Sequence, residues 1–65
     1  MKHFIEVASG YTANDAKRTW LNLDDVTYVT LEPDSNNRYG IALRGSHVHV
    51  SREDADRILK ALKQL

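Results

Sequence analysis

Two histidines, His47 and His49, carry the chemistry that this sequence most directly suggests. They stand one residue apart in the stretch "SHVHVSRED" (46–54), ahead of a serine and several charged residues. On a strand, positions i and i+2 lie on the same face, so two imidazoles at this spacing could ligate one metal ion or act as a general acid and base. A structural role or an ordinary surface position is the competing interpretation.

The surroundings of the histidine pair favour the structural or surface interpretation. A metal site needs at least a third protein ligand, and His3 is the only other imidazole in the chain. No carboxylate is tied to the pair by its spacing, and Arg44, which we expect beside His47, would repel a cation. We therefore expect no metal ion and no cofactor, and we keep the pair as a candidate binding element.

The other familiar catalytic patterns are missing from the sequence. Asp24 and Asp25 are adjacent, so their side chains point apart in a turn, which favours a solvated turn over a carboxylate dyad. The chain has no cysteine, no G-x-S-x-G and no phosphate-binding loop, and its three glycines are dispersed. A chain of 65 residues also has little room for a pocket of about 300 Å³. We predict that the protein is not an enzyme and has no catalytic residues.

Length and charge restrict the partners that we expect. The 65 residues make one small domain (1–65) with a marginal core, and such domains usually add disulfides, a metal or a partner subunit. The absence of cysteine makes oligomerisation the commonest of these solutions, so we expect a homo-oligomer. Nine basic and nine acidic residues balance, whereas nucleic-acid-binding domains usually have a pI above about 9. No stretch resembles a signal peptide or a membrane span, so we expect a cytoplasmic protein.

The order of β-prone runs and turn residues predicts a small α+β domain. β-branched and aromatic residues recur in short runs between turn-forming residues, and the end of the chain changes to a helical period. We predict an antiparallel β-meander of about five strands, closed by one C-terminal amphipathic helix packed on the sheet. The predicted strands cover residues 3–8, 18–23, 26–32, 38–43 and 47–50, and the predicted helix covers residues 52–64.

The dipeptide at 45–46 predicts a two-residue hairpin loop, because its glycine supplies the positive φ that such loops need. That loop would place Arg44 opposite His47 and Leu43 opposite Val48. The apolar residues of both strands then share one face, and the histidines share the other. We expect the helix to cover the apolar face, which consists of Ile41, Leu43, Val48 and Val50.

Ser51 begins the predicted helix as its N-cap, and Asp54 three residues later completes a capping box. Acidic residues near the start and lysines near the end complement the helix dipole. An apolar stripe at helical spacing should face the sheet, and its members are Ala55, Ile58, Leu59, Leu62 and Leu65.

The sheet face opposite the helix is the best candidate for a binding surface. Strand alternation would turn Val29 and Leu31 inward and leave Tyr28 pointing outward beside Ala42 and His49. Aromatic and basic groups around small residues suit a protein interface or single-stranded nucleic acid, and an ordinary solvated face is the alternative. We expect Trp20 in the core or in a subunit interface. The candidate binding residues on the outer face are Tyr28, Arg44, His47 and His49.

One segment of the chain resembles a known family. The stretch "LNLDDVTYVTLEPD" (21–34) resembles the L-N-x-x-x-I-x-Y-I…P-D segment of the small flagellar and swarming-motility proteins. "IALRGSHVHVSRE" (41–53) is similar to the strand, glycine turn, strand and helix start that follow in that family. Extra residues at 35–37 and a longer loop at 9–17 depart from the pattern. The resemblance implies a cytoplasmic, non-enzymatic accessory role and provides no catalytic residues.

A second resemblance, to the carbon storage regulator family, concerns a shorter segment. Those small dimeric RNA-binding proteins have a V-x-V-H-R-E segment, and "VHVSRE" (48–53) has Ser51 in place of their histidine. The basic residues of that family's first strand are absent from "MKHFIEV" (1–7).

We therefore predict a non-enzymatic binding or regulatory module that acts through protein contacts. An RNA-binding regulator using Arg44 and Arg52 is the alternative, and a histidine-dependent metal-binding protein is a distant one.

Overall fold

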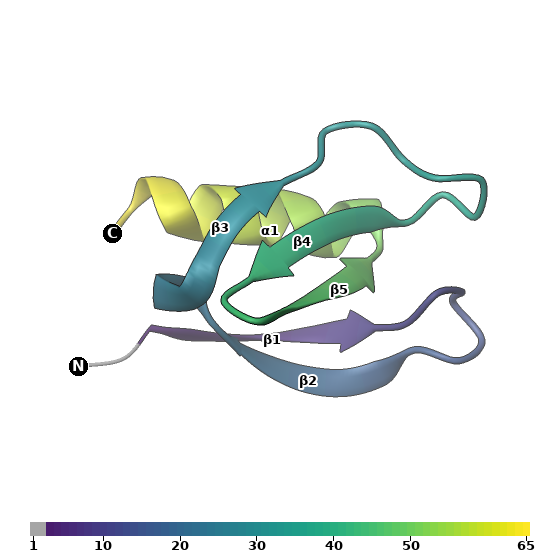
Figure 1. Ribbon diagram of the computed structural model, residues 1–65, viewed down its shortest axis with the longest axis horizontal. Coiled ribbons are helices and arrows are strands. Elements are labelled where there is room, and N and C mark those ends of the chain that lie inside the picture. The colour runs from purple at the N-terminus through teal and green to yellow at the C-terminus, as the bar shows by residue number, and fades with distance from the viewer. Residues whose placement is uncertain (1–2) are drawn as a thin grey trace.

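The computed structural model describes residues 3–65 and confirms the predicted fold class: five antiparallel strands are followed by one helix (Figure 1). In Figure 1 the helix lies behind β3 and β4, and the β1–β2 hairpin runs below β5. The elements are β1 (Phe4–Ser9), β2 (Lys17–Asn22), the 3-10 helix η1 (Leu23–Asp25), β3 (Val26–Val29), β4 (Tyr39–Leu43), β5 (Ser46–Val50) and α1 (Arg52–Lys63).

The strands form two sheets, β1–β2 and β3–β4–β5, where the sequence suggested one continuous meander. The predicted tight turn at Asp24 and Asp25 is the 3-10 helix η1, capped by the Asn22 side chain, which accepts a hydrogen bond from the Asp24 N–H at 3.0 Å. Leu23, at the start of η1, is buried in the core. This turn, anchored by the buried Leu23, carries the chain from one sheet to the other, so β2 and β3 do not pair.

The β1–β2 hairpin turns one apolar face to the core. Val7 and Leu21 are buried, and Val7 lies opposite Thr19 in the register. Trp20 points the other way, with 64% of its surface exposed, so the expectation that it belongs to the core is wrong.

The β4–β5 hairpin forms as predicted, but its turn lies one residue earlier. Leu43 pairs with Ser46, so the turn holds Arg44 and Gly45, and Gly45 has a φ of 80°. The predicted pairings of Arg44 with His47 and of Leu43 with Val48 are therefore wrong. The register differs from the predicted one by two residues, and because side chains alternate by two, the faces are unchanged. The apolar face is the one we expected.

The β3–β4 pairing also follows the prediction until β3 ends. Val29 lies opposite Ile41, as expected, but the strand stops there instead of continuing to residue 32. The Thr30 side-chain hydroxyl accepts the Gly40 N–H at 2.7 Å and so takes the place that a strand carbonyl would occupy. The chain then leaves the sheet, and Leu31, which we expected to point inward, is 76% exposed.

Helix α1 packs the predicted apolar stripe on the core along most of its length, but Leu59 lies outside the core cluster and the prediction for Leu65 is wrong. Ala55 and Ile58 are buried, Leu62 is partly buried, and Leu65 lies beyond the helix and is exposed. Within residues 3–65, no helix has the length and apolar character needed to cross a membrane. The buried cluster joins both sheets, η1 and α1, and contains Val7, Leu21, Leu23, Ile41, Val50, Ala55 and Ile58.

Ser51→Ala tests the start of this helix. The Ser51 hydroxyl accepts the Asp54 N–H at 3.2 Å, so the substitution leaves one helix-end donor without its partner. We expect the free energy of unfolding in urea to fall by about 1 kcal/mol. Ser51→Asp keeps a capping oxygen and is the matched control, expected to stay near the original stability. Equal losses of stability in both variants would show that the side-chain oxygen at position 51 is not what stabilises the start of the helix.

Candidate functional site

The outer sheet face is the side of β3–β4–β5 that turns away from the core, and we define it by Tyr28, Thr30, Gly40, Ala42, His47 and His49. Tyr28 lies opposite Ala42, and Ala42 lies opposite His47, so these three side chains form one row across the sheet. His49 lies opposite Gly40, two residues further along the two strands, and not opposite Ala42 as the predicted register would place it. Tyr28 is 63% exposed, and the residues between the larger side chains are small.

The two histidines contact each other and a third ring. Their ring centroids lie 5.3 Å apart, edge to face. Tyr11, from the loop between β1 and β2, lies 4.8 Å from the His49 ring. Aromatic pairs at these separations attract one another. Tyr11 was not among the predicted site residues, because its loop position gave no periodic pattern, and it enlarges the aromatic surface around His49.

Within residues 3–65, the histidine pair is not joined by the further ligands that a metal ion would need. His3 lies 3.3 Å from Asp24, beside η1 and away from the other two imidazoles. Across residues 3–65, no three His, Cys, Asp or Glu side chains are grouped so that they could hold a metal ion. Asp24 and Asp25 lie in η1, and the Asp25 backbone carbonyl accepts the Arg44 N–H at 2.9 Å. The histidine pair therefore presents imidazole edges and faces to solvent and to Tyr11.

The two arginines of the nucleic-acid alternative lie at opposite ends of β5. Arg44 is exposed in the turn before this strand, and Arg52 is the first residue of α1 after it. Five strand residues at about 3.3 Å each separate the two ends by roughly 17 Å. Arg44 borders the outer sheet face, whereas Arg52 lines a groove between α1 and Tyr39. They do not form one basic patch.

A shallow hollow of about 200 Å³ opens at one end of the outer sheet face. It is smaller than the pockets of about 300–1,000 Å³ that bind small molecules. Backbone N–H groups of Arg38 and Asn36, at 3.0 and 2.8 Å, hold the pKa of Asp34 below its ordinary value, and nearby His49 lowers this pKa further. Asp34 therefore stays ionised at neutral pH. The hollow is lined by Thr30, Glu32, Pro33, Asp34, Arg38, Gly40 and His49.

Arg38 is buried behind the outer sheet face and holds several backbone segments together. Only 5% of its surface is exposed, and its guanidinium donates to three backbone carbonyls. These belong to Gly10 at 3.1 Å, Ala8 at 3.2 Å and His49 at 3.4 Å. The Gly10 N–H also donates to the His49 carbonyl at 2.9 Å. Arg38 thus ties the loop that carries Tyr11 to the strand that carries His49.

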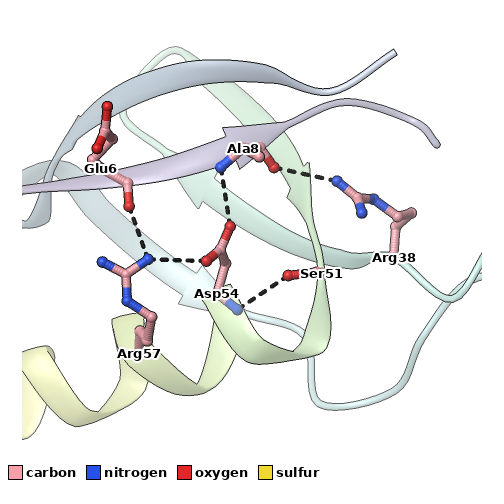
Figure 2. A network of polar contacts seen from close by, with 6 residues as sticks. All are labelled: Glu6, Ala8, Arg38, Ser51, Asp54 and Arg57. Carbon is pink, nitrogen blue, oxygen red and sulfur yellow. Dashed lines mark hydrogen bonds and ion pairs between the residues drawn. The ribbon is translucent and has the colours of Figure 1, made fainter. Parts of the chain in front are cut away.

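Two residues of α1 complete the attachment of β1 (Figure 2). Asp54 accepts the Ala8 N–H at 3.0 Å, and Arg57 donates to the Glu6 carbonyl at 3.0 Å. Arg57 and Asp54 also form an ion pair at 2.9 Å. The edge of β1 that faces away from β2 is therefore satisfied mainly by side chains and not by another strand. No sequence pattern predicted this arrangement, because its partners are backbone groups far away in the chain.

Comparison with protein-family models, with curated proteins and with solved structures gives no match to this chain. The likeness to the small flagellar proteins and to the carbon storage regulators therefore stays an interpretation of the sequence.

Proposed function

We propose that this protein is a small, non-enzymatic binding or regulatory module that recognises a partner protein through the outer sheet face. The observation that carries the proposal is Tyr28, a large aromatic side chain on the edge strand β3 that is 63% exposed next to the small residue Ala42 of the central strand β4. Tyrosine and arginine are over-represented among the residues that dominate protein interfaces. Tyr28, Arg44, His47 and His49 are the proposed contact residues.

A protein partner fits this surface better than a small molecule or a nucleic acid. The hollow beside His49 has room for one inserted side chain but is small for a metabolite. The chain carries no net charge, and the arginines at the two ends of β5 do not form the basic stripe that phosphate binding needs. The aromatic rings and small residues instead offer a partly apolar contact area.

The setting that we propose for this module is the cytoplasm. The chain has no cysteine, which agrees with a reducing compartment. The resemblance to the small flagellar and swarming-motility proteins, with no catalytic residues to carry over, agrees with an accessory role. Self-association of the chain is part of the proposal, because a core this small gains stability from a second subunit.

Alanine substitution on the outer face tests the proposal. A photo-crosslinking amino acid at position 28 would capture the partner in the host, and purified partner would then be titrated with the variants. We expect Tyr28→Ala and Arg44→Ala each to weaken binding by about 2 kcal/mol, roughly thirtyfold, with little change in folding. Lys60→Ala, on the exposed side of α1, is the matched control and should bind normally.

Two results would contradict the proposal. A folded variant with alanine at all four proposed contact positions that keeps full binding would leave the outer face as plain solvated surface. Capture of RNA, with an affinity that falls steeply with salt and depends on both Arg44 and Arg52, would replace the protein partner by the nucleic-acid alternative.

A further inference from the structure

The exposed edge of β2 has unpaired backbone groups whose direction can be worked out from β1. The Glu6 carbonyl and both backbone groups of Ala8 bond to side chains on the side away from β2. In an antiparallel ladder, residues alternate between bonding to the neighbouring strand and bonding away from it. Trp20 and Arg18, the register partners of Glu6 and Ala8, therefore direct their N–H and C=O groups outward from β2.

This edge differs from the other strand edges between residues 3 and 65. The second edge of β1 is occupied by Arg38, Asp54 and Arg57. At the open edge of β5, the His49 carbonyl already accepts hydrogen bonds from the Gly10 N–H and from Arg38. The outer edge of β3 is only four residues long and carries a register irregularity between Val26 and Tyr28, a feature that discourages pairing. β2 ends its sheet with six regular residues. A regular edge of this kind is a template for another strand.

The side chains along β2 complement a second copy of the same strand. Trp20 is exposed beside the edge, and Arg18 lies 3.5 Å from Glu6 of β1. Only residues whose backbone groups point outward from β2 can bond to a second strand. Arg18 and Trp20 must therefore pair with one of the outward-pointing residues of that strand, which are Arg18, Trp20 and Asn22. Placing Arg18 opposite Arg18 would set like charges against each other, which is unfavourable. Placing Arg18 opposite Asn22 would form no pair between a cation and an aromatic ring. Placing Arg18 opposite Trp20 sets a guanidinium against an aromatic ring, twice by symmetry, which favours this register.

We propose that two copies of this protein dimerise by antiparallel pairing of their β2 edges, with the two-fold axis at Thr19. Each Arg18 then lies opposite Trp20 of the second copy, and the two hairpins join into one four-stranded sheet. Each tryptophan then lies between Glu6 of its own chain and Arg18 of the second copy, so an anion and a cation stand on either side of the ring. This interface is on a different strand and a different sheet from Tyr28, so its test is independent of the proposed partner-binding face.

The first test is the mass of the 7.4 kDa chain across a hundredfold dilution, by light scattering or sedimentation. We expect a dimer at high concentration and a melting temperature that falls on dilution. Trp20→Ala and Arg18→Pro should each raise the dimer dissociation constant by about tenfold or more. The proline removes an N–H that faces outward, so the ladder to β1 keeps its bonds. Tyr28→Ala removes an equally exposed aromatic from the other sheet and should leave dimerisation unchanged.

The register has its own test, because the chain contains no cysteine. With the axis at Thr19, Thr19→Cys places two thiols directly opposite each other and should form an intermolecular disulfide under mild oxidation. Thr27→Cys on β3 is the control and should not. The amides of Arg18 and Trp20 should also exchange more slowly at high concentration. A monomer at every concentration, loss of the dimer on Tyr28→Ala but not on Trp20→Ala, or cross-linking through position 27 alone would overturn the proposal.

Discussion

Arg38→Ala is expected to lower the free energy of unfolding by about 2–4 kcal/mol, because three backbone carbonyls lose their shared donor inside the protein. A buried acceptor without a partner costs the full penalty of its lost hydration, and of these three carbonyls only that of His49 has a second donor, the Gly10 N–H. A single core in a chain of this size rarely supplies more than about 3–5 kcal/mol in total. Urea unfolding followed by circular dichroism should therefore show a variant that keeps at most about 3 kcal/mol of stability and unfolds at a much lower urea concentration.

Two variants separate the effect of burial from the effect of charge. Arg38→Lys keeps the charge but offers a single ammonium group in place of a planar fork, so we expect an intermediate loss. Arg57→Ala also removes a guanidinium bonded to a β1 carbonyl, but that side chain is 53% exposed, so we expect a loss below about 1 kcal/mol. Equal losses for Arg38→Ala and Arg57→Ala would show that the buried position of Arg38 has no special importance.

Ile58→Ala is expected to cost about 2–5 kcal/mol, because Ile58 is fully buried between α1 and the sheets. The substitution removes apolar contact and leaves a cavity that a packed core closes only in part. Leu65→Ala is the matched control: it belongs to the same predicted stripe, but the side chain is exposed, so the change should stay within about 0.5 kcal/mol. Similar losses in both would mean that α1 is not docked on the sheets as described.

Features that depend on neighbouring residues could be predicted from the sequence. The Ser51 cap, the apolar stripe of α1 and the β4–β5 hairpin each rest on residues close in the chain, and the structure confirms them. The exact position of the hairpin turn was wrong by one residue, because Gly45 can occupy either turn position. The alternation of side chains nevertheless placed Tyr28, His47 and His49 on the outer sheet face.

Features that depend on distant contacts could not be predicted in this way. The division into two sheets follows from a short 3-10 helix whose Leu23 is buried against other elements, and an acidic dipeptide gives no sign of it. From the sequence alone, Arg38 is an ordinary charged residue at the start of a predicted strand. Its partners are backbone carbonyls 28, 30 and 11 residues away. Every residue has such a carbonyl, so the residue types do not indicate which ones Arg38 contacts.

The attachment of β1 by side chains has a kinetic consequence. The bonds from Ala8 to Asp54 and from Glu6 to Arg57 span 46 and 51 residues, so they close the longest hydrogen-bonded loops within residues 3–65. Loop closure of this length costs chain entropy, and contacts between distant segments form late in folding. We expect the β4–β5–α1 segment to order first and the N-terminal hairpin to dock after the rate-limiting barrier. Arg38→Ala should then accelerate unfolding and leave the refolding rate nearly unchanged, whereas a slower refolding limb would place hairpin docking in the transition state.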